Sequence, residues 1–161
     1  MLQANLRTAE ELYQYSLEHN LGTGLGRNWG ITNFRLVEKK LEPGEKAFLS
    51  FVGLHQFRSM SSHQRNFAYA ITNQRILMGQ VRTFGRIRFQ SVPLNEILNI
   101  SFDNENSIGV MKILLDGDAV TIGMGQETAV ALSRELTELL PLLQDLAYKM
   151  SSKSEDPEDD A

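Results

Sequence analysis

The sequence predicts an α+β domain that is mainly β, with seven antiparallel strands placed between two N-terminal helices and one C-terminal helix. Two observations support this fold class. From Lys46 to Met124, short runs of alternating apolar and polar residues are separated by turn residues, which is typical of strands joined in hairpins. On both sides of this region, apolar residues recur at steps of three and four, which is typical of amphipathic helices.

The composition is that of a globular domain that needs no covalent cross-links. The chain has 161 residues, of which 42% are hydrophobic, and it has no cysteine. This length is sufficient to bury a core, and the lack of cysteine excludes disulfides, thiol catalysis and cysteine zinc sites. No signal peptide is recognised, and no apolar run approaches the roughly 18 residues needed to cross a bilayer. We therefore expect a soluble, cytoplasmic protein.

The first 42 residues predict a helical extension. Thr8 and Glu11 have the spacing of a capping box, and the helix that they begin should run to about Asn20. A glycine-rich stretch and a loop anchored by Trp29 then separate it from a second helix, predicted over residues 32–41.

Seven strands follow, with Thr72–Gln74, Gly85 and Asp116–Asp118 in tight turns. In the fourth strand, Arg86 and Arg88 alternate with Ile87 and Phe89, so we expect the arginines on one face of the sheet and the apolar pair in the core. The predicted strands span residues 46–54, 66–71, 75–82, 86–92, 97–103, 108–115 and 119–124.

The last predicted element is a long helix over residues 126–150, which Pro141 should kink or split. Its apolar seam continues through Leu143, Leu146 and Met150, beyond what one end of the domain needs, so these three residues are candidates for an oligomer interface. Residues 151–161 are rich in Asp, Glu and Ser and predict a disordered acidic tail. The resulting division is a helical extension over 1–42, a domain over 43–150 and the tail.

Three segments carry a resemblance to a known family. The hairpin Phe67–Met78 contains a Thr-Asn-Gln-Arg turn before an apolar strand, Gln90–Ile97 is a short bend into the fifth strand, and Leu41–Glu45 is a lead-in. Together they resemble bacterial pleckstrin-homology (PH)-like proteins of the YokE-like group, although Gln74 stands where that turn usually has Lys. The resemblance implies a PH-like barrel of seven antiparallel strands capped by a C-terminal helix. It also implies an adaptor role, since PH-like barrels are mostly adaptors.

Charge is sorted along the chain. Residues 46–95 contain seven Lys or Arg and no Asp or Glu, whereas residues 96–150 contain three basic and nine acidic residues. One interpretation is a binding surface for phosphate, carboxylate or an acidic protein, because the guanidinium fork suits such groups. The other is charge balance between neighbouring strands, which needs no function. The candidate anion- or partner-binding residues are Arg58, Arg65, Arg82, Arg86 and Arg88.

These patterns favour a non-enzymatic binding or assembly module. Neither a catalytic pairing nor a metal motif is recognised, the three histidines are expected to be solvated loop residues, and we expect no cofactor. Apart from its acidic tail the chain is neutral, which argues against nucleic acid. The preferred partner is an acidic protein or a second copy in a homo-oligomer, with at most weak membrane binding. The alternative is a peripheral module that binds anionic lipid through Arg58, Arg65, Arg86 and Arg88, and an uncharacterised enzyme comes third.

Overall fold

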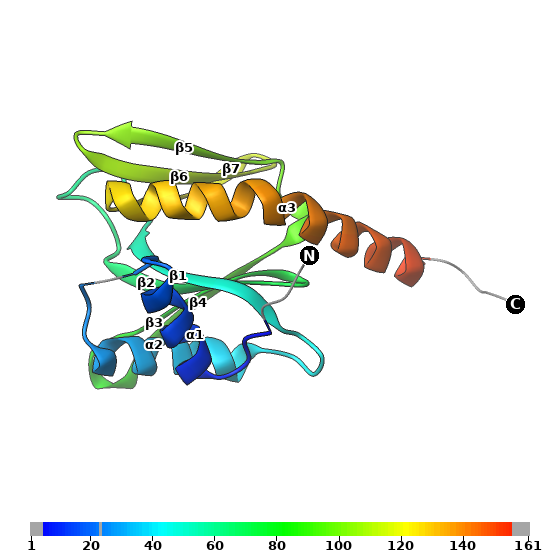
Figure 1. The fold of residues 1–161 in the computed structure, drawn as a ribbon, viewed down its shortest axis with the longest axis horizontal. Coiled ribbons are helices and arrows are strands. Elements are labelled where there is room, and N and C mark those ends of the chain that lie inside the picture. The colour runs from blue at the N-terminus through cyan, green and yellow to red at the C-terminus, as the bar shows by residue number, and fades with distance from the viewer. Residues whose placement is uncertain (1–4, 23, 156–161) are drawn as a thin grey trace, which may run out of the picture.

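The computed structural model describes residues 5–22 and 24–155, and Figure 1 shows the arrangement of its elements. In chain order these are α1 (Ala9–Glu18), α2 (Arg27–Lys40), β1 (Ala47–His55), β2 (Asn66–Thr72), β3 (Arg75–Val81), β4 (Ile87–Pro93), β5 (Asn99–Glu105), β6 (Ile108–Leu115), β7 (Asp118–Met124) and α3 (Gln126–Glu155). Two short 3-10 turns, η1 (Thr83–Gly85) and η2 (Leu94–Glu96), precede β4 and β5.

All seven strands belong to one antiparallel sheet in the order β4-β3-β2-β1-β7-β6-β5. This confirms the predicted mainly-β architecture of seven antiparallel strands followed by a helix. β4 and β5 are the two edges of the sheet, so backbone hydrogen bonds among the described residues do not close it into a complete barrel. The pairing of β1 with β7 is short, linking Leu54 to Gly123 and His55 to Ile122. The sheet therefore has two halves, β1–β4 and β5–β7.

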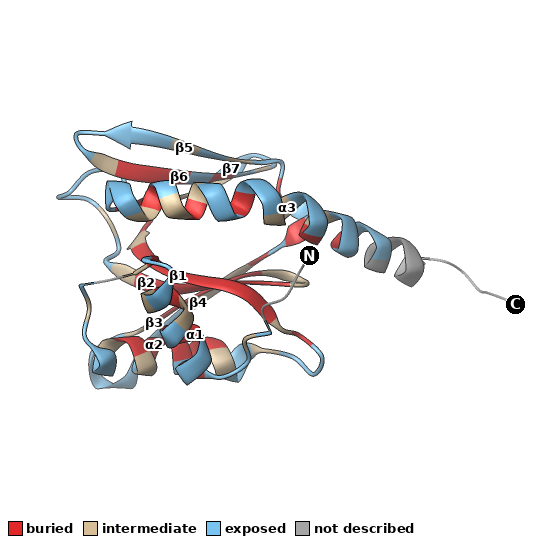
Figure 2. Ribbon diagram, viewed as in Figure 1, coloured by how far each residue is buried: buried red, intermediate tan, exposed pale blue. Residues whose placement is uncertain are grey.

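Helices cover both faces of the β1–β4 half. In Figure 1, α1 and α2 lie below it, while α3 passes above it, between this half and β5–β7. Two apolar clusters correspond to these layers. One joins α3 to both halves of the sheet, and the other joins α1 and α2 to the outer face through Val52, Ala68, Ala70 and Leu77. Figure 2 accordingly shows buried residues along the central strands and along one stripe of α3.

The N-terminal helices differ from the prediction at one end. The capping box is confirmed, since the Glu11 amide donates to the Thr8 hydroxyl and the Thr8 amide to the Glu11 carboxylate, both at 3.1 Å. α2, however, begins at Arg27, five residues earlier than predicted, and Trp29 lies inside it. Gly30 lies within α2 and packs against the ring of Tyr13. A Cβ at this position would collide with that ring, so glycine is needed there. The glycine thus serves close packing and does not end the helix.

α3 continues to Glu155, five residues past the predicted end, and is one helix with Pro141 inside it. It is therefore not split, and in Figure 1 its axis changes direction in the orange part. Of the interface candidates on α3, Leu143 is fully buried in its own chain, Leu146 is partly exposed, and the side chain of Met150 lies outside the described residues. The remainder of the predicted acidic tail, residues 156–161, also lies outside them.

Candidate functional site

Two of the seven cations between residues 46 and 95 have structural partners. Arg75 forms a double hydrogen bond with the buried carboxylate of Glu45, from Nε to Oε2 and from a terminal nitrogen to Oε1, both at 3.0 Å. The Thr72 hydroxyl donates to the same carboxylate at 2.7 Å. Lys46 lies over the ring of Phe48, 5.9 Å from its centre.

The environment of Glu45 keeps its carboxyl ionised. Burial alone would raise the pKa of Glu45, but the hydrogen bonds from Arg75, the Glu42 amide and Thr72 outweigh this and lower the pKa below its usual value. Glu45 comes from the lead-in segment and Arg75 from the Thr-Asn-Gln-Arg turn. Two of the segments that carry the family resemblance are therefore joined by this buried ion pair, which removes Arg75 from the set of residues available to a ligand.

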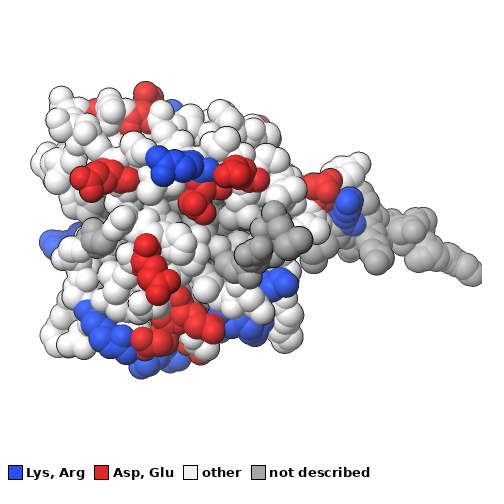
Figure 3. Space-filling view, viewed as in Figure 1, with Lys and Arg blue, Asp and Glu red and all other residues white. Residues whose placement is uncertain are grey.

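Within residues 5–22 and 24–155, the other five arginines have no anionic partner. The side chains of Arg58, Arg65, Arg82, Arg86 and Arg88 are exposed, and none forms an ion pair or a side-chain hydrogen bond with another described residue. The N-terminal helices differ, because Arg27 there donates to both oxygens of Glu10. Figure 3 shows the two signs of charge intermingled over α1 and α2. Five unpaired guanidinium groups thus gather at the loop end of the domain, while on the helical face Arg27 is paired and Arg35 is exposed without an acidic partner among the described residues.

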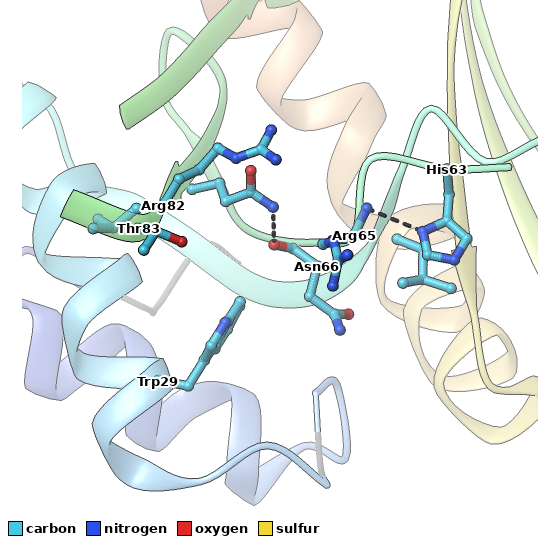
Figure 4. Close-up of a pocket in the computed structure, with 9 residues that line it drawn as sticks. Trp29, His63, Arg65, Asn66, Arg82 and Thr83 are labelled. Carbon is cyan, nitrogen blue, oxygen red and sulfur yellow. Dashed lines mark hydrogen bonds between the residues drawn. The ribbon is translucent and has the colours of Figure 1, made fainter. Parts of the chain in front are cut away.

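Arg65 and Arg82 line a pocket of about 580 Å³, here called the Trp29 pocket, which Figure 4 shows in close-up. Trp29 projects into it from α2, Arg65 comes from the end of the β1–β2 loop, and Arg82 directly follows β3. Arg65 has a φ of +68°, and its amide donates to His63 Nδ1 at 3.0 Å, which fixes the loop locally. The walls are formed by Trp29, Leu54, His63, Arg65, Asn66, Gln80, Val81, Arg82 and Thr83.

Gln80 is the buried polar residue of this pocket. Its side chain is only 5% exposed, and its amide nitrogen donates to the carbonyls of Gln64 and Asn66, each at 3.0 Å. These two bonds fix the orientation of the amide, because only the nitrogen can donate. Its oxygen, Oε1, is buried and has no hydrogen-bond partner among the described residues. An acceptor in this state is costly unless a donor reaches it.

A second hollow, here called the tip hollow, adjoins the Trp29 pocket and shares Arg82 and Thr83 with it. It has a volume of about 530 Å³ and surrounds the β3–β4 turn. Phe84, in the middle of this turn, is 97% exposed and has a φ of +62°, a left-handed conformation that bulky residues rarely adopt. The hollow is lined by Arg82, Thr83, Phe84, Arg86, Ile87 and Arg88.

The expected division of the fourth strand is wrong at Ile87. This side chain is 51% exposed, although the alternation with Arg86 and Arg88 predicted that it would enter the core. It pairs with Val81 at the last position of the β3–β4 ladder, next to the exposed turn. Phe89 is partly buried and packs against the cluster between α2 and the sheet, and Lys40 Nζ lies 5.2 Å from the centre of its ring. The tip thus presents two apolar side chains between arginines.

Arg58 lies apart from the other four arginines. It lines a third hollow of about 360 Å³ between the β1–β2 loop and the start of β7, and Asp118 contributes to the same wall. His63 belongs to both this hollow and the Trp29 pocket. The structure therefore groups Arg65 with Arg82, and Arg82 with Arg86 and Arg88, whereas Arg58 shares its hollow with an acidic residue.

His55 was expected to be a solvated loop residue, and this is wrong. It ends β1 and is 2% exposed, with Nδ1 2.8 Å from the Tyr69 hydroxyl and Nε2 3.1 Å from Gln90 Oε1. Its ring stacks on Phe67, with 4.1 Å between ring centres. Burial lowers the pKa of His55, and nearby Arg88 lowers it further although the hydrogen bond to Gln90 opposes this. Both ring nitrogens are occupied, which leaves neither available to activate a nucleophile.

Sequence reasoning missed three residues of this region: Trp29, Gln80 and Phe84. A signal existed for Phe84, because an aromatic residue next to the turn glycine and between two arginines has few ways to be buried. No signal existed for Trp29 or Gln80, whose positions depend on how α2 packs beside the ends of β2 and β3.

In the described ranges, 5–22 and 24–155, no group of three His, Asp or Glu residues is arranged to hold a metal ion. None of the described helices is both long and apolar enough to span a membrane.

Comparison with known proteins gives the family. Residues 41–137 match the model of a family described as bacterial PH domain. No curated protein matches the sequence. The hSac2 domain from human phosphoinositide phosphatase Sac2 aligns with a TM-score of 0.52 and 12% identity, over 76% of this chain and 85% of that one. At this identity the likeness shows the fold alone.

Two further solved structures align less well. A DUF1696 family protein with a pleckstrin-homology domain from Shewanella loihica gives a TM-score of 0.47 at 14% identity, over 68% of this chain and 87% of that one. The DH/PH domains of p115-RhoGEF (R399E mutant) give a TM-score of 0.42 at 10% identity, over 88% of this chain and 42% of that one. The family assignment rests on the sequence match, which covers more than half of the chain: this protein belongs to the bacterial PH domain family.

Proposed function

We propose that this protein is a non-enzymatic PH module that docks on anionic membrane surfaces through its β3–β4 tip. The observation that carries the proposal is Phe84, an almost fully exposed aromatic residue at the end of a hairpin, flanked by the unpaired guanidinium groups of Arg82 and Arg86. An aromatic ring surrounded by cations suits the boundary between lipid head groups and acyl chains.

The magnitudes favour weak, salt-dependent docking. Each Arg near an anionic leaflet contributes about 1 kcal/mol, and burying one Phe side chain contributes about 2 kcal/mol. The favourable binding free energy would be about 5 kcal/mol, before the cost of immobilising the protein, from Arg82, Arg86, Arg88 and Phe84 together. This is a weak interaction by itself, which a second docking point or a specific head group would strengthen.

The shape of the tip favours a membrane over the acidic protein partner that the sequence pattern first suggested. Phe84 stands at the end of a turn, so nearly all of its surface faces solvent. A deformable lipid surface can surround such a side chain, whereas a protein partner would need a pocket of matching shape. A non-enzymatic role is supported by the family and by His55, whose ring nitrogens both have partners.

The test is sedimentation with two kinds of liposome. One is phosphatidylcholine alone, and the other contains about 30 mol% phosphatidylglycerol, which is anionic. We expect binding to the anionic vesicles that falls as salt rises, because exposed charges are screened within about 8 Å at physiological ionic strength. Phe84→Ser should weaken binding about thirtyfold, and Arg86→Gln with Arg88→Gln by a similar factor, because each change removes about 2 kcal/mol.

Matched controls are present in the chain. Tyr148 is an exposed aromatic residue on α3, and Arg35 and Arg134 are exposed cations on other elements. Tyr148→Ser, and Arg35→Gln combined with Arg134→Gln, remove the same chemistry elsewhere and should leave binding unchanged. Equal losses in test and control variants would show charge attraction without a docking face. No vesicle binding, together with Phe84-dependent binding of an acidic peptide, would favour the protein partner instead.

A further inference from the structure

The short seam between the two halves of the sheet ends at His55, the last residue of β1. His55 pairs with Ile122 of β7 there. Its backbone also closes the β1–β2 loop, because its amide donates to the Arg65 carbonyl at 2.9 Å and its carbonyl accepts from the Gln64 amide at 2.8 Å. A change at this one residue therefore reaches both the seam and the loop that carries Arg58.

The hydrogen bonds of the His55 ring determine where its proton lies. Gln90 Oε1 can only accept, so the ring donates to it from Nε2 across 3.1 Å. Nδ1 is then the acceptor of a neutral ring, and the Tyr69 hydroxyl donates to it at 2.8 Å. A single proton on the ring satisfies both contacts.

A second proton on the ring would break this arrangement. It would place an N–H at Nδ1 opposite the O–H of Tyr69, a fully buried residue whose hydroxyl has no other hydrogen-bond partner among the described residues. A buried hydroxyl that loses its acceptor destabilises the folded state. The second proton would also create a buried cation. Burial is the main reason that the pKa of His55 is lowered, the bond to Gln90 opposes this effect, and the charge of Arg88 adds to it.

The surroundings of the ring offer no negative charge to compensate for that proton. The ring stacks on Phe67 of β2, and its strand partner Ile122 is also apolar. The titratable or charged groups that act on the ring are Tyr69 of β2 and Arg88 of β4. In the described part of the chain, no Asp or Glu forms an ion pair with His55. Protonation is therefore favourable only when the ring reaches water.

We propose that His55 is a pH-sensitive switch: in mildly acidic solution, protonation of its ring opens the end of β1 and releases the β1–β2 loop, while the rest of the fold stays closed. Local opening breaks few bonds, namely the two backbone bonds of His55 and the bond from the Phe57 amide to the Thr121 carbonyl at 3.0 Å. Such small units can open well below the free energy of global unfolding. The switch does not rest on the membrane proposal, whose docking tip is the β3–β4 turn.

The test is amide hydrogen exchange of the ¹⁵N-labelled full-length protein, followed by NMR between about pH 7.5 and about pH 5.5. Glu45 stays ionised in this range, because its pKa lies below 4.5. The opened segment takes up a proton with the ordinary pKa of histidine, 6.5, whereas the closed one does not. After correction for intrinsic exchange, protection of the His55, Phe57 and Gln64 amides should therefore fall by up to about tenfold for each pH unit below 6.5.

An internal control shows whether the opening is local. The Val52 amide, in the same strand, donates to the Leu21 carbonyl at 2.9 Å and lies outside the segment that should open. It should keep its protection over the whole range. A parallel loss at Val52 would show global acid unfolding and would overturn the proposal.

Variants assign the pH dependence to one ring. His55→Gln retains one donor and one acceptor but takes up no proton, so protection of the Phe57 amide should no longer change with pH. His63→Gln and His19→Gln remove the other two histidines of the chain and should retain the pH dependence. If His55→Gln does not fold, the ring resonances of the wild-type protein decide. At about pH 6 they should show a neutral ring with its proton on Nε2, although an exposed histidine is mostly protonated there.

The other contrary outcomes are equally direct. The proposal is overturned if protection of the loop amides does not change in the wild-type protein, or if its pH dependence survives His55→Gln or disappears in His63→Gln. A His55 ring that is mostly protonated at about pH 6, in a loop that keeps its protection, would overturn it as well.

Discussion

Glu45 and Arg75 show how the charge-sorted segment serves folding as well as binding. The Glu45 side chain is fully buried and accepts hydrogen bonds from Arg75, Thr72 and the Glu42 amide. A buried charge is tolerated only when it is paired and hydrogen-bonded in this way. Arg65 and Arg82 are in the opposite situation, because both are exposed and neither has an acidic partner in the part of the chain that the structure describes. The same residue type, within a short stretch of sequence, has a structural role at one position and is available to a ligand at the others.

Loss of the Glu45 carboxylate should destabilise the fold. In Glu45→Gln the partly buried Arg75 loses its counter-ion, and removing one partner of a buried pair costs about 3 kcal/mol. Urea denaturation at pH 7 measures this. Glu10→Gln, which removes the acid of the exposed pair with Arg27, is the matched control and should change the free energy of unfolding little.

The same pair predicts a pH dependence. Because the folded-state pKa of Glu45 lies below its ordinary value of 4.5, its contribution is complete above pH 4.5 and is lost as pH falls through the folded pKa. The wild-type protein should therefore lose more stability than Glu45→Gln below pH 4.5. Parallel stability curves for the two proteins over this range would contradict the assignment.

At the scale of elements, strands were easier to predict from the sequence than the helix boundary or the pocket. Hairpin turns and alternation specify local structure, and all seven strands are present. The start of α2 was predicted five residues too late because Trp29 was assigned to the loop after the glycine-rich stretch, whereas Trp29 lies inside the helix. Alternation also predicted a core position for Ile87, because the pattern does not show where the helices stop covering the face of the sheet. The Trp29 pocket joins α2, a loop and β3, and such long-range packing has no local signature.

The exposed stripe of α3 carries a prediction about self-association. Leu142 and Leu146, one helical turn apart, are exposed, while Leu143 and Ala147 pack into the core. Leu142→Glu with Leu146→Glu should therefore leave the fold intact, and it should shift a homo-oligomer toward monomer in size-exclusion chromatography with light scattering. Val130→Glu, at an exposed position near the start of the helix, is the control. A wild-type protein that stays monomeric at high concentration would remove the case for this interface.

At the scale of the whole molecule, the sequence division treats residues 1–42 as an extension of a domain that starts at residue 43. The packing gives these helices a larger role. α1 and α2 cover the outer face of β1–β3, where Val52, Ala68, Ala70 and Leu77 form one cluster with Leu12 and Phe34. Leu6 also pairs with Ala47 by two backbone hydrogen bonds, which ties the N-terminal segment to β1. The Trp29 pocket depends on the same docking.

Deleting residues 1–42 tests whether these helices are a separable extension or a required part of the folded domain. Without α1 and α2, the apolar outer face of the sheet would be exposed to water, at a cost of about 25 cal/mol for each Å² uncovered. We expect residues 43–161 alone to aggregate or to lose cooperative unfolding in urea. Added salt should restore neither the solubility nor the cooperative unfolding of this fragment. Exposed apolar area of this kind is a common cause of association. Cooperative unfolding of the truncated chain, with a stability near that of the full chain, would show that the bacterial PH domain folds alone. The helices would then contribute mainly the Trp29 wall of the pocket.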